Sequence, residues 1–399
     1  MASIVIIGGG AAGCFCAAEL SALHPDWHIR VLEAGQHPMA KLAVTGGGRC
    51  NITNTFEGVE ALAKVYPRGD KLMRKLLGRF GWKDCLDWFG NHGVEFTAQE
   101  DHCVFPVSQD AMQIVHVLER QMHIGGVELM CRHKVISIDK GLNVKYLHAG
   151  KEASMKADAV VLATGGGTAG ILAGTDIELI PSVPSLFTLK IDDDALRDLM
   201  GTVVGSVTLG LVGTRFRSEG TLLVTDWGIS GPATLKLSSY AARWLAQEEY
   251  RGSLLVDWLG GGEQQARQIL EELGRNGARM VANTHPPQLT DRLWRYLLSR
   301  ASVRAGCRWN ELGSKGLARI VNTLISDIYR INGRARFKEE FVSCGGISLS
   351  EIRPDTMESR RIPGLYLAGE VLDMDAVTGG FNLQAAWSSA WVAAHSIHL

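Results

Sequence analysis

The chain has 399 residues, of which 46% are hydrophobic and 21% are charged, and its formal net charge is −1. This composition is typical of a globular protein and excludes a disordered or fibrous chain, while the length allows two or three domains. The balanced charge excludes a protein that is strongly basic overall. No continuous apolar stretch of about 18 residues occurs, so we expect no membrane span.

The cysteines and the N-terminal segment indicate where the protein works. None of the eight cysteines forms a Cys-x-x-Cys pair or a His/Cys cluster with zinc-ligand spacing. We therefore expect no metal site and no disulfide framework. The apolar segment Ile4–Leu20 lacks a preceding basic region and is interrupted by glycines, so we do not expect a signal peptide. These features predict a cytoplasmic protein without a membrane partner.

The N-terminal half begins with the pattern of a βαβ unit. A strand is predicted at Ile4–Ile7, a helix at Ala11–Leu23 after a glycine turn, and a second strand at His28–Glu33. The Gly- and Thr-rich run Ala40–Asn54 is expected to be a loop. Further along we predict helices at Asp84–Gly90 and Gln109–Met122, and strands at Val127–Met130, Val135–Ile138 and Ala159–Ala163.

The sequence pattern changes near Pro184. Alternating residues predict antiparallel strands at Thr202–Leu211 and Thr221–Thr225, followed by a helix from about Pro232 to Glu249. From Gly262 to about Ile331 the pattern is helical and basic. The last predicted elements are strands at Phe341–Ile347 and Leu365–Ala368 and a helix at Leu383–His398. The chain is therefore expected to be an α/β protein with an insertion of different character.

A Gly-x-Gly-x-x-Gly motif follows the first strand and opens the first helix. Gly8 permits a tight turn, Gly10 lets the backbone approach a pyrophosphate, and Gly13 allows close packing of helix and strand. Glu33, twenty residues beyond Gly13, has the position of the acid that binds ribose hydroxyls. With Ala12, these residues form a predicted dinucleotide site; a plain tight turn is the alternative.

A second glycine motif follows the strand that ends at Ala163. Residues 165–170 also spell Gly-x-Gly-x-x-Gly, but the following Ile171–Pro184 contains glycine and proline and does not resemble a helix. We therefore reject a separate NAD(P) domain. Instead, we predict that Ala163, Thr164 and Gly165 make a second contact with the first dinucleotide.

Two further segments have the character of ligand-binding loops. The glycine run that starts at Thr45 continues into Arg49, Cys50 and Asn51, and a plain flexible loop is its alternative. Arg49 faces a phosphate or a flavin carbonyl in this interpretation, and Cys50 is either an inert buried residue or a proton donor. Near the C-terminus, a strand leads to a sheet edge and a glycine turn opens the last helix. The remaining predicted cofactor contacts are Lys41, Gly369, Glu370, Asp373, Gly380, Phe381 and Asn382.

Together these motifs resemble a family of bacterial flavoproteins, the aminoacetone-oxidase-like or BaiN/RdsA type. The matching segments are Gly8–Gly13, Thr45–Asn51, Ala163–Gly166, Gly228–Pro232, Thr356–Ser359 and Gly369–Trp387. The resemblance covers nearly the whole chain and implies FAD as cofactor. It implies a Rossmann-like FAD-binding domain at 1–183 and 348–399, an inserted antiparallel β domain at 184–261 and 338–347, and a helical basic subdomain at 262–337. The chain departs from the family pattern at Thr168–Pro181, which is shortened.

Two segments are strongly basic. Residues 64–83 hold seven Lys and Arg against Asp70, and residues 291–338 hold eleven against three acids. Each segment is either a solvated helix face or a surface for phosphate groups. Family members are known to oxidise aminoacetone, to reduce a steroid double bond in bile acids, and to reduce uridine to dihydrouridine in 23S rRNA. Only the last activity uses both basic segments.

We therefore predict an FAD-dependent oxidoreductase that reduces an activated C=C bond, with uridine in 23S rRNA as substrate and NADH or NADPH as a transient electron donor. In such chemistry a hydride attacks one carbon and an acid protonates the other, and Cys50 is the predicted acid. The alternatives are a small-molecule amine oxidase, a steroid or bile-acid double-bond reductase, and a ribosome-associated binding protein in which FAD is structural.

Overall fold

The computed structural model describes residues 1–335 and 342–399. The chain divides into two compact units, Met1–Ser182 with Val342–Leu399, and Val183–Phe341. The three predicted domains divide the chain more finely, and their boundaries stay a prediction. The predicted boundary at 337/338 and the first residue of the predicted strand Phe341–Ile347 lie outside the described residues.

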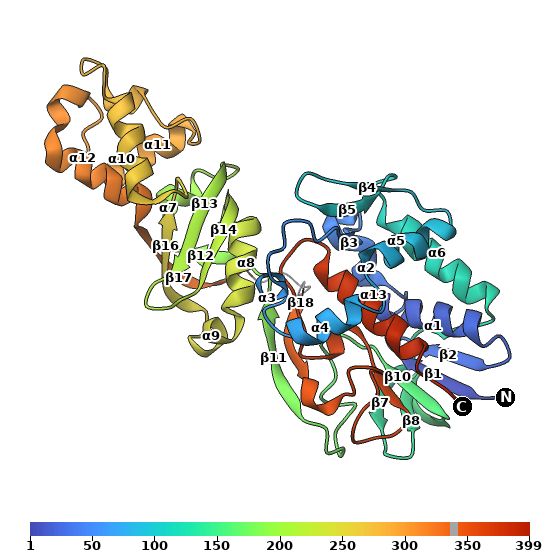
Figure 1. Ribbon diagram of the computed structural model, residues 1–399. Helices are drawn as coiled ribbons and strands as arrows, with labels where there is room; N and C mark the ends of the chain where they lie inside the picture. The colour runs from blue at the N-terminus through green and yellow to red at the C-terminus, as the bar shows by residue number, and fades with distance from the viewer. Residues whose placement is uncertain (336–341) are drawn as a thin grey trace. The chain divides into compact units, whose positions relative to one another are not determined.

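A five-stranded parallel sheet forms the centre of the first unit (Figure 1). Its strand order is β19–β10–β1–β2–β6, and all neighbouring strands are parallel. The bounds are β1 Ser3–Ile7, β2 His28–Leu32, β6 Glu128–Met130, β10 Ala159–Leu162 and β19 Leu365–Leu367. Strands β1 and β10 are almost fully buried apolar runs, because a parallel sheet is covered on both faces. The predicted βαβ unit is confirmed, since α1 (Ala11–Leu23) joins β1 to β2.

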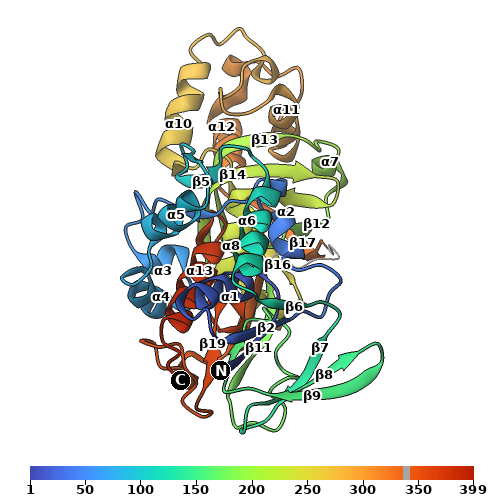
Figure 2. The same cartoon turned by 90° about the vertical axis from the view of Figure 1, so that its right-hand side faces the viewer.

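Helices cover one face of this sheet, and a small antiparallel sheet lies on the other (Figures 1 and 2). Helix α1 packs against α6 and against the C-terminal helix α13. The helices are α6 Ala111–Ile124 and α13 Phe381–Ala394, and the antiparallel strands are β7 Lys134–Ile138, β8 Asn143–His148 and β9 Lys151–Lys156. Phe15 of α1 lies 5.5 Å from Trp387 of α13 between ring centroids. Both rings are fully buried, and burial of one such side chain contributes roughly 1.5–3 kcal/mol.

The predicted loop Ala40–Asn54 is only partly a loop. Its first residues form α2 (Ala40–Gly48), which loses helical geometry at Thr45, and its last two form the short strand β3 (Thr53–Asn54). The glycines after Thr45 have positive φ angles, which glycine adopts without steric cost. The remaining elements before α6 are α3 Leu62–Val65, α4 Asp70–Leu77, α5 Trp82–Asn91, β4 Phe96–Ala98 and β5 Cys103–Pro106, with β3, β5 and β4 forming one sheet.

Strand β11 (Leu179–Ser185) begins in the first unit and pairs with β18 (Val342–Ile347), the strand by which the chain returns. Short 3₁₀ helices follow at η2 (Leu349–Glu351) and η3 (Gly369–Val371). In the described part of the chain, no helix is both long and apolar enough to cross a membrane.

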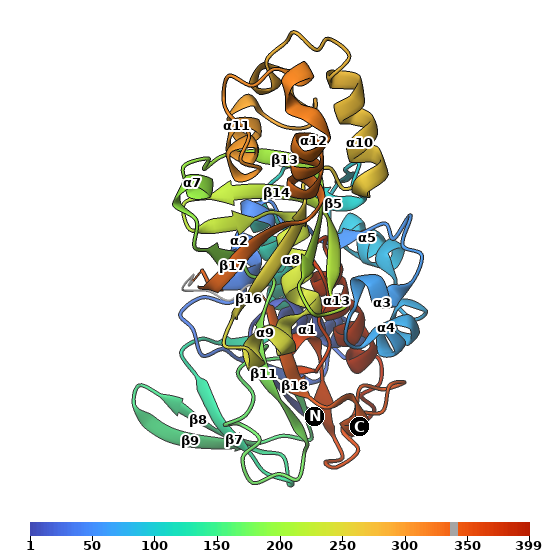
Figure 3. The ribbon, with the colours of Figure 1, turned by 90° about the vertical axis from the view of Figure 1, so that its left-hand side faces the viewer.

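The second unit is built on a closed antiparallel barrel (Figure 3). Its strand order is β12–β15–β14–β13–β16–β17, and β12 pairs with β17 to close it. The bounds are β12 Leu189–Ile191, β13 Val203–Leu211, β14 Arg217–Thr225, β15 Gly228–Ser230, β16 Arg251–Asp257 and β17 Asp327–Arg334, with short helices α7 Asp194–Arg197, α8 Pro232–Tyr240 and α9 Ala242–Gln247. The predicted helix Pro232–Glu249 is therefore two helices.

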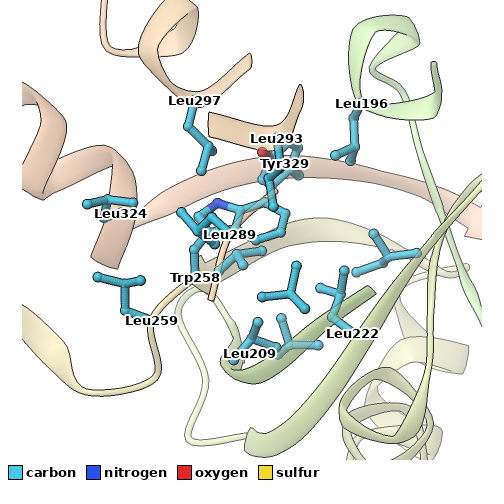
Figure 4. Packing of buried hydrophobic residues seen from close by; sticks show 14 of the residues in the cluster. Leu196, Leu209, Leu222, Trp258, Leu259, Leu289, Leu293, Leu297, Leu324 and Tyr329 are labelled. Carbon is cyan, nitrogen blue, oxygen red and sulfur yellow. The ribbon is translucent and has the colours of Figure 1, made fainter. Parts of the chain in front are cut away.

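A helical part is inserted between β16 and β17. It consists of α10 (Gly262–Leu273), η1 (Val281–Asn283), α11 (Asp291–Arg300) and α12 (Trp309–Ile325). Figure 4 shows Trp258, just after β16, packed with Leu293, Leu297 and Leu324 of the helices and with Leu289, which precedes α11. The helices therefore share one apolar core with the barrel.

The helical stretch predicted from Gly262 to about Ile331 extends beyond the last helix, α12, which ends at Ile325. Residues from Asp327 onward form strand β17, in which buried and exposed side chains alternate. Asp327, Tyr329 and Ile331 face inward and Ile328 and Arg330 face solvent, which is the period of two expected for a strand.

Candidate nucleotide and cofactor site

The turn between β1 and α1 has no room for side chains at two of its glycines. Gly8 has φ +103°, and a Cβ there would lie 2.5 Å from the Ala163 carbonyl oxygen. A Cβ on Gly13 would lie 1.9 Å from the Gly8 carbonyl oxygen. In contrast, a Cβ on Gly10, the residue before α1, would meet no described atom within 4 Å. Gly8 and Gly13 are thus required by the fold, whereas Gly10 leaves open space at a helix N-terminus, where anions bind.

Glu33 closes the end of β2 beside this turn. One carboxylate oxygen accepts a hydrogen bond from the Gly9 N–H at 2.7 Å, and the other accepts from the Gly35 N–H at 2.6 Å. Backbone N–H groups thus hold the carboxylate in one orientation at the carboxyl edge of the sheet, where ligands bind in folds of this kind.

A cleft of about 510 Å³ opens at this sheet edge. It is lined by Ile7, Gly8, Leu32, Glu33, Ala34, His133, Lys134, Val135, Ile136, Thr164, Gly167, Gly170 and Ile171. The Thr164 hydroxyl is buried and has no hydrogen-bond partner among the described residues. A largely apolar cleft that contains a fixed carboxylate and a hydroxyl without a hydrogen-bond partner suits the adenosine half of a dinucleotide.

The predicted second contact with the dinucleotide, at residues 163–165, lies beside the turn between β1 and α1. Ala163 packs against Gly8, and Gly165, at φ +70°, lies next to the Glu370 carboxylate. The motif at 163–165 and the motif at 8–13 therefore meet at one sheet edge, because β10 and β1 are neighbouring parallel strands.

Glu370 lies where three segments of the first unit converge. It accepts a hydrogen bond from the Ser343 N–H at 2.7 Å, and the Lys41 ammonium lies 3.9 Å from its other oxygen. Burial raises the pKa of this carboxyl group, and the charge of Lys41 opposes the increase. Lys41 and Glu370, both predicted cofactor contacts, are thus brought together.

The raised pKa of Glu370 predicts a pH dependence of stability. The neutral form is favoured in the folded protein, so the wild type loses stability as the pH rises through the raised pKa. Glu370→Gln keeps the size and an acceptor but cannot ionise. With both proteins free of flavin, we expect the melting temperature of the variant, relative to wild type, to rise as the pH increases from about 4, near the ordinary glutamate pKa, toward neutral pH. Thermal melts across this range test it, and a difference independent of pH would contradict it.

The loop after α2 is bound to the start of α13. Oriented so that its donors and acceptors match, the Asn51 amide donates to the Thr53 carbonyl at 3.0 Å and accepts from the Gly380 N–H at 3.1 Å. Asn54 donates to the Gly379 carbonyl at 3.1 Å. A Cβ on Gly380 would lie 2.3 Å from the Thr53 carbonyl oxygen, so only glycine fits. Two motifs more than 300 residues apart in the sequence thus form one structure.

The other predicted residues of the C-terminal motif have local partners. The Asn382 side chain accepts from the Ala376 N–H at 2.9 Å and donates to the Ala376 carbonyl at 3.0 Å. Phe381 is buried beside Tyr66, whose hydroxyl donates to the Phe381 carbonyl at 2.8 Å. The Asp373 N–H donates to the Ile347 carbonyl at 2.9 Å. Their contacts with a cofactor stay a prediction.

Arg49 and Cys50 differ in accessibility. The Arg49 guanidinium is exposed, lies 4.4 Å from the centre of the Phe105 ring, and donates to the Gly46 carbonyl at 3.1 Å. Cys50 is fully buried with φ +62°, and burial raises the pKa of its thiol to about 12. The thiol is therefore neutral, and its role as a proton donor stays a prediction.

Several residues of the site were not predicted from the sequence. His133 and the first residues of β7, Lys134 and Val135, line the cleft, and the Ser343 N–H donates to Glu370. The sequence indicated a strand at 135–138, but no local signal shows that this strand lines the same cleft as Gly8. In the described residues, no group of three or more His, Cys, Asp or Glu could hold a metal ion.

Much of the charge in segment 64–83 is neutralised by acids elsewhere. Arg68 forms a bidentate ion pair with the fully buried Asp375. Lys64 pairs with Glu60, and Lys75 lies 3.6 Å from Asp355. The sequence count therefore overestimates the positive surface of this segment.

The arginines of helix α11, in the second basic segment, also have partners. Arg295 binds Asp291 at 2.9 Å, and Arg292 donates to the Asp198 carbonyl at 2.6 Å. Arg300 donates to Asp327 at 2.7 Å. Arg336 and Lys338, counted in the predicted segment 291–338, lie outside the described residues.

Comparison with known proteins identifies relatives over the full length. The chain is 29% identical over 411 residues to the ribosomal RNA dihydrouridine synthase of Escherichia coli (strain K12), covering 98% of this chain and 97% of that protein. It is 28% identical over 410 residues to the 3-dehydro-bile acid delta(4,6)-reductase of Clostridium scindens, covering 98% of each. These relatives confirm the predicted oxidoreductase class.

Solved structures confirm the fold class. The 3-ketosteroid delta1-dehydrogenase of Sterolibacterium denitrificans superimposes with a TM-score of 0.53 at 12% identity, covering 99% of both chains. The 3-ketosteroid-delta4-(5alpha)-dehydrogenase of Rhodococcus jostii RHA1 gives a TM-score of 0.51 at 14% identity, covering 99% of this chain and 96% of that one. The model of the HI0933-like protein Rossmann domain matches residues 2–396. The chain therefore belongs to the HI0933-like Rossmann domain family.

Proposed function

We propose that this protein is an FAD-dependent reductase that adds hydride to an activated C=C bond, and that its substrate is uridine in 23S rRNA. The observation that carries the cofactor assignment is the glycine turn between β1 and α1. Gly10 leaves open space at the start of α1, beside a cleft that contains the fixed Glu33 carboxylate and the unpartnered Thr164 hydroxyl.

The residues present fit FAD. The start of α1 would hold the pyrophosphate, and Glu33 would accept from the adenosine ribose hydroxyls. Glu370, with Lys41, would lie toward the flavin end, where the start of α13 favours negative charge. FAD, when bound, supplies a hydride to a carbon–carbon double bond. NADH or NADPH as a transient donor, and a cytoplasmic location, belong to the same proposal.

The substrate assignment is supported by two relatives. The chain is 29% and 28% identical to proteins from Escherichia coli and Haemophilus influenzae that carry the name ribosomal RNA dihydrouridine synthase. An activated C=C bond is also the substrate class named for the bile-acid relative. Reduction of a steroid-like double bond is therefore the second candidate function, and it shares the cofactor site.

Nucleoside mass spectrometry of 23S rRNA tests the substrate. A strain without this gene should lack a dihydrouridine that its parent contains. The intact gene should restore the nucleoside, and a Gly10→Val gene should not. Equal dihydrouridine in the parent and deletion strains would contradict the proposal and would make the steroid-like substrate the leading candidate.

Cys50 is the proposed proton donor to the second carbon of the double bond. If the thiol supplies this proton, Cys50→Ala should lower turnover by about 10²–10⁴-fold while the flavin content stays normal. Cys50→Ser is the matched control, since it retains a hydroxyl proton at nearly the same volume and should recover part of the activity. Full turnover in flavin-loaded Cys50→Ala would remove this role.

A further inference from the structure

The helical part of the second unit has a basic end far from the barrel. Helix α10 starts five residues after β16, and α12 ends shortly before β17, so the end of α10 and the start of α12 lie away from the barrel (Figure 3). Here residues 277–281 and 307–310 run side by side in antiparallel direction. Met280 and Arg308 form an isolated antiparallel β-bridge through their backbones, and the Val281 N–H donates to the Cys307 carbonyl at 2.9 Å.

Four arginines lie on these two segments or within three residues of them. We call Arg275, Arg279, Arg304 and Arg308 the distal arginine cluster. All four are exposed, and none of their guanidinium groups forms a hydrogen bond or ion pair with another residue in the described ranges. Residues 273–280 and 301–310 contain no acid. The cluster therefore retains its full charge and all of its hydrogen-bond donors.

The neighbouring acids do not neutralise the cluster. Glu271 and Glu272 are exposed at the end of α10, and Glu311 accepts from the Arg308 backbone N–H at 3.1 Å as a helix cap. None of them forms an ion pair with a cluster guanidinium in the described part of the chain. This contrasts with α11, where Arg295 and Arg300 are paired with Asp291 and Asp327.

We propose that the distal arginine cluster is an RNA-binding surface that contacts the phosphate backbone of the substrate. The proposal rests on the proposed function and assigns the binding of RNA to a different surface from α11 and from segment 64–83. Guanidinium groups bind phosphate oxygens in a bidentate manner, so four free groups on neighbouring parts of the chain could each hold a phosphate. Such contacts give affinity and orientation without reading the base sequence.

Salt-dependent RNA binding tests the cluster in the full-length, flavin-loaded protein. The probe is an in vitro transcript of 23S rRNA, and its Kd is measured over a range of KCl concentrations. In the test variant all four arginines are replaced: Arg275→Gln, Arg279→Gln, Arg304→Gln and Arg308→Gln. The control loses the same charge at exposed positions elsewhere: Lys145→Gln, Lys151→Gln, Lys156→Gln and Lys190→Gln.

We expect the test variant to bind at least about tenfold more weakly, and its salt slope to fall by about 3 units. The control should change the slope by less than about 1 unit. Flavin content and melting temperature should match wild type in both, because the replaced side chains are exposed.

Two results would overturn the inference, and they differ in what they leave standing. If wild type binds the transcript and the test variant binds equally well, the cluster is not the RNA surface, but the proposed function stands. If wild type shows no salt-dependent binding, both the cluster and the proposed RNA substrate are rejected.

Discussion

Gly10→Val is expected to give a folded protein without flavin. A side chain at Gly10 enters open space in the structure, so the fold should tolerate it at a cost of about 1 kcal/mol for a poor helix N-cap. The same side chain would occupy the space through which a pyrophosphate approaches the start of α1. Flavin bound per protein should fall by about tenfold or more, a loss of at least about 1.4 kcal/mol in binding. Absorbance of the purified protein measures it.

Gly13→Ala is the matched control, because it is a smaller change at a position with no space. Its Cβ would lie 1.9 Å from the Gly8 carbonyl oxygen, so the turn or the helix must move. We expect a loss of about 3 kcal/mol of stability or insoluble protein, with or without flavin. If Gly10→Val retains flavin, Gly10 is not needed for cofactor binding. If Gly10→Val unfolds as Gly13→Ala does, Gly10 is required by the fold, which would also contradict the prediction.

Asp327→Ala is expected to destabilise the second unit strongly. Asp327 is buried and accepts from Arg300 at 2.7 Å, from the Trp258 ring N–H at 3.1 Å, and from the Tyr329 hydroxyl. This cluster joins α11 to β17, and Arg300 also reaches Asp193 at 3.2 Å. Loss of the carboxylate removes the acceptor of the Trp258 and Tyr329 donors and one of the two acids that pair with Arg300. We expect a loss of about 3–5 kcal/mol, measured by chemical denaturation.

Asp291→Ala provides the comparison on the same helix. Its carboxylate pairs with Arg295 at 2.9 Å, and both side chains are about half exposed. Exposed pairs contribute little, so this variant should unfold at the wild-type denaturant concentration. Equal stability of Asp327→Ala and Asp291→Ala would show that the buried cluster does not hold the helices to the barrel.

The sequence predicted the parts of the fold with strong local patterns. The strand, glycine turn and helix at residues 4–23 were predicted nearly to the residue, because each glycine has a distinct steric role. Strand β17 was missed because its polar inward residue, Asp327, looks like a surface residue in sequence. The apolar Ile328 faces solvent, so it also interrupts the alternation that Tyr329 and Ile331 follow.

The charge of the two basic segments could not be judged from sequence. Arg68 forms an ion pair with Asp375, some 300 residues away, and Arg300 forms one with Asp327. The charge of each arginine is therefore neutralised within the protein. Conversely, Arg275 and Arg279 lie outside both predicted segments, because the acids of α10 precede them in sequence. The pairing of 277–281 with 307–310 places Arg279 and Arg308 on adjoining stretches, with Arg275 and Arg304 a few residues away along the chain.

Reduction of uridine by the bound flavin is tested by mixing chemically reduced, flavin-loaded protein with 23S rRNA from the deletion strain, without oxygen. We expect the flavin absorbance to return and one dihydrouridine to form for each flavin oxidised. RNA that leaves the flavin reduced, while a steroid with a conjugated double bond oxidises it, would contradict the RNA substrate.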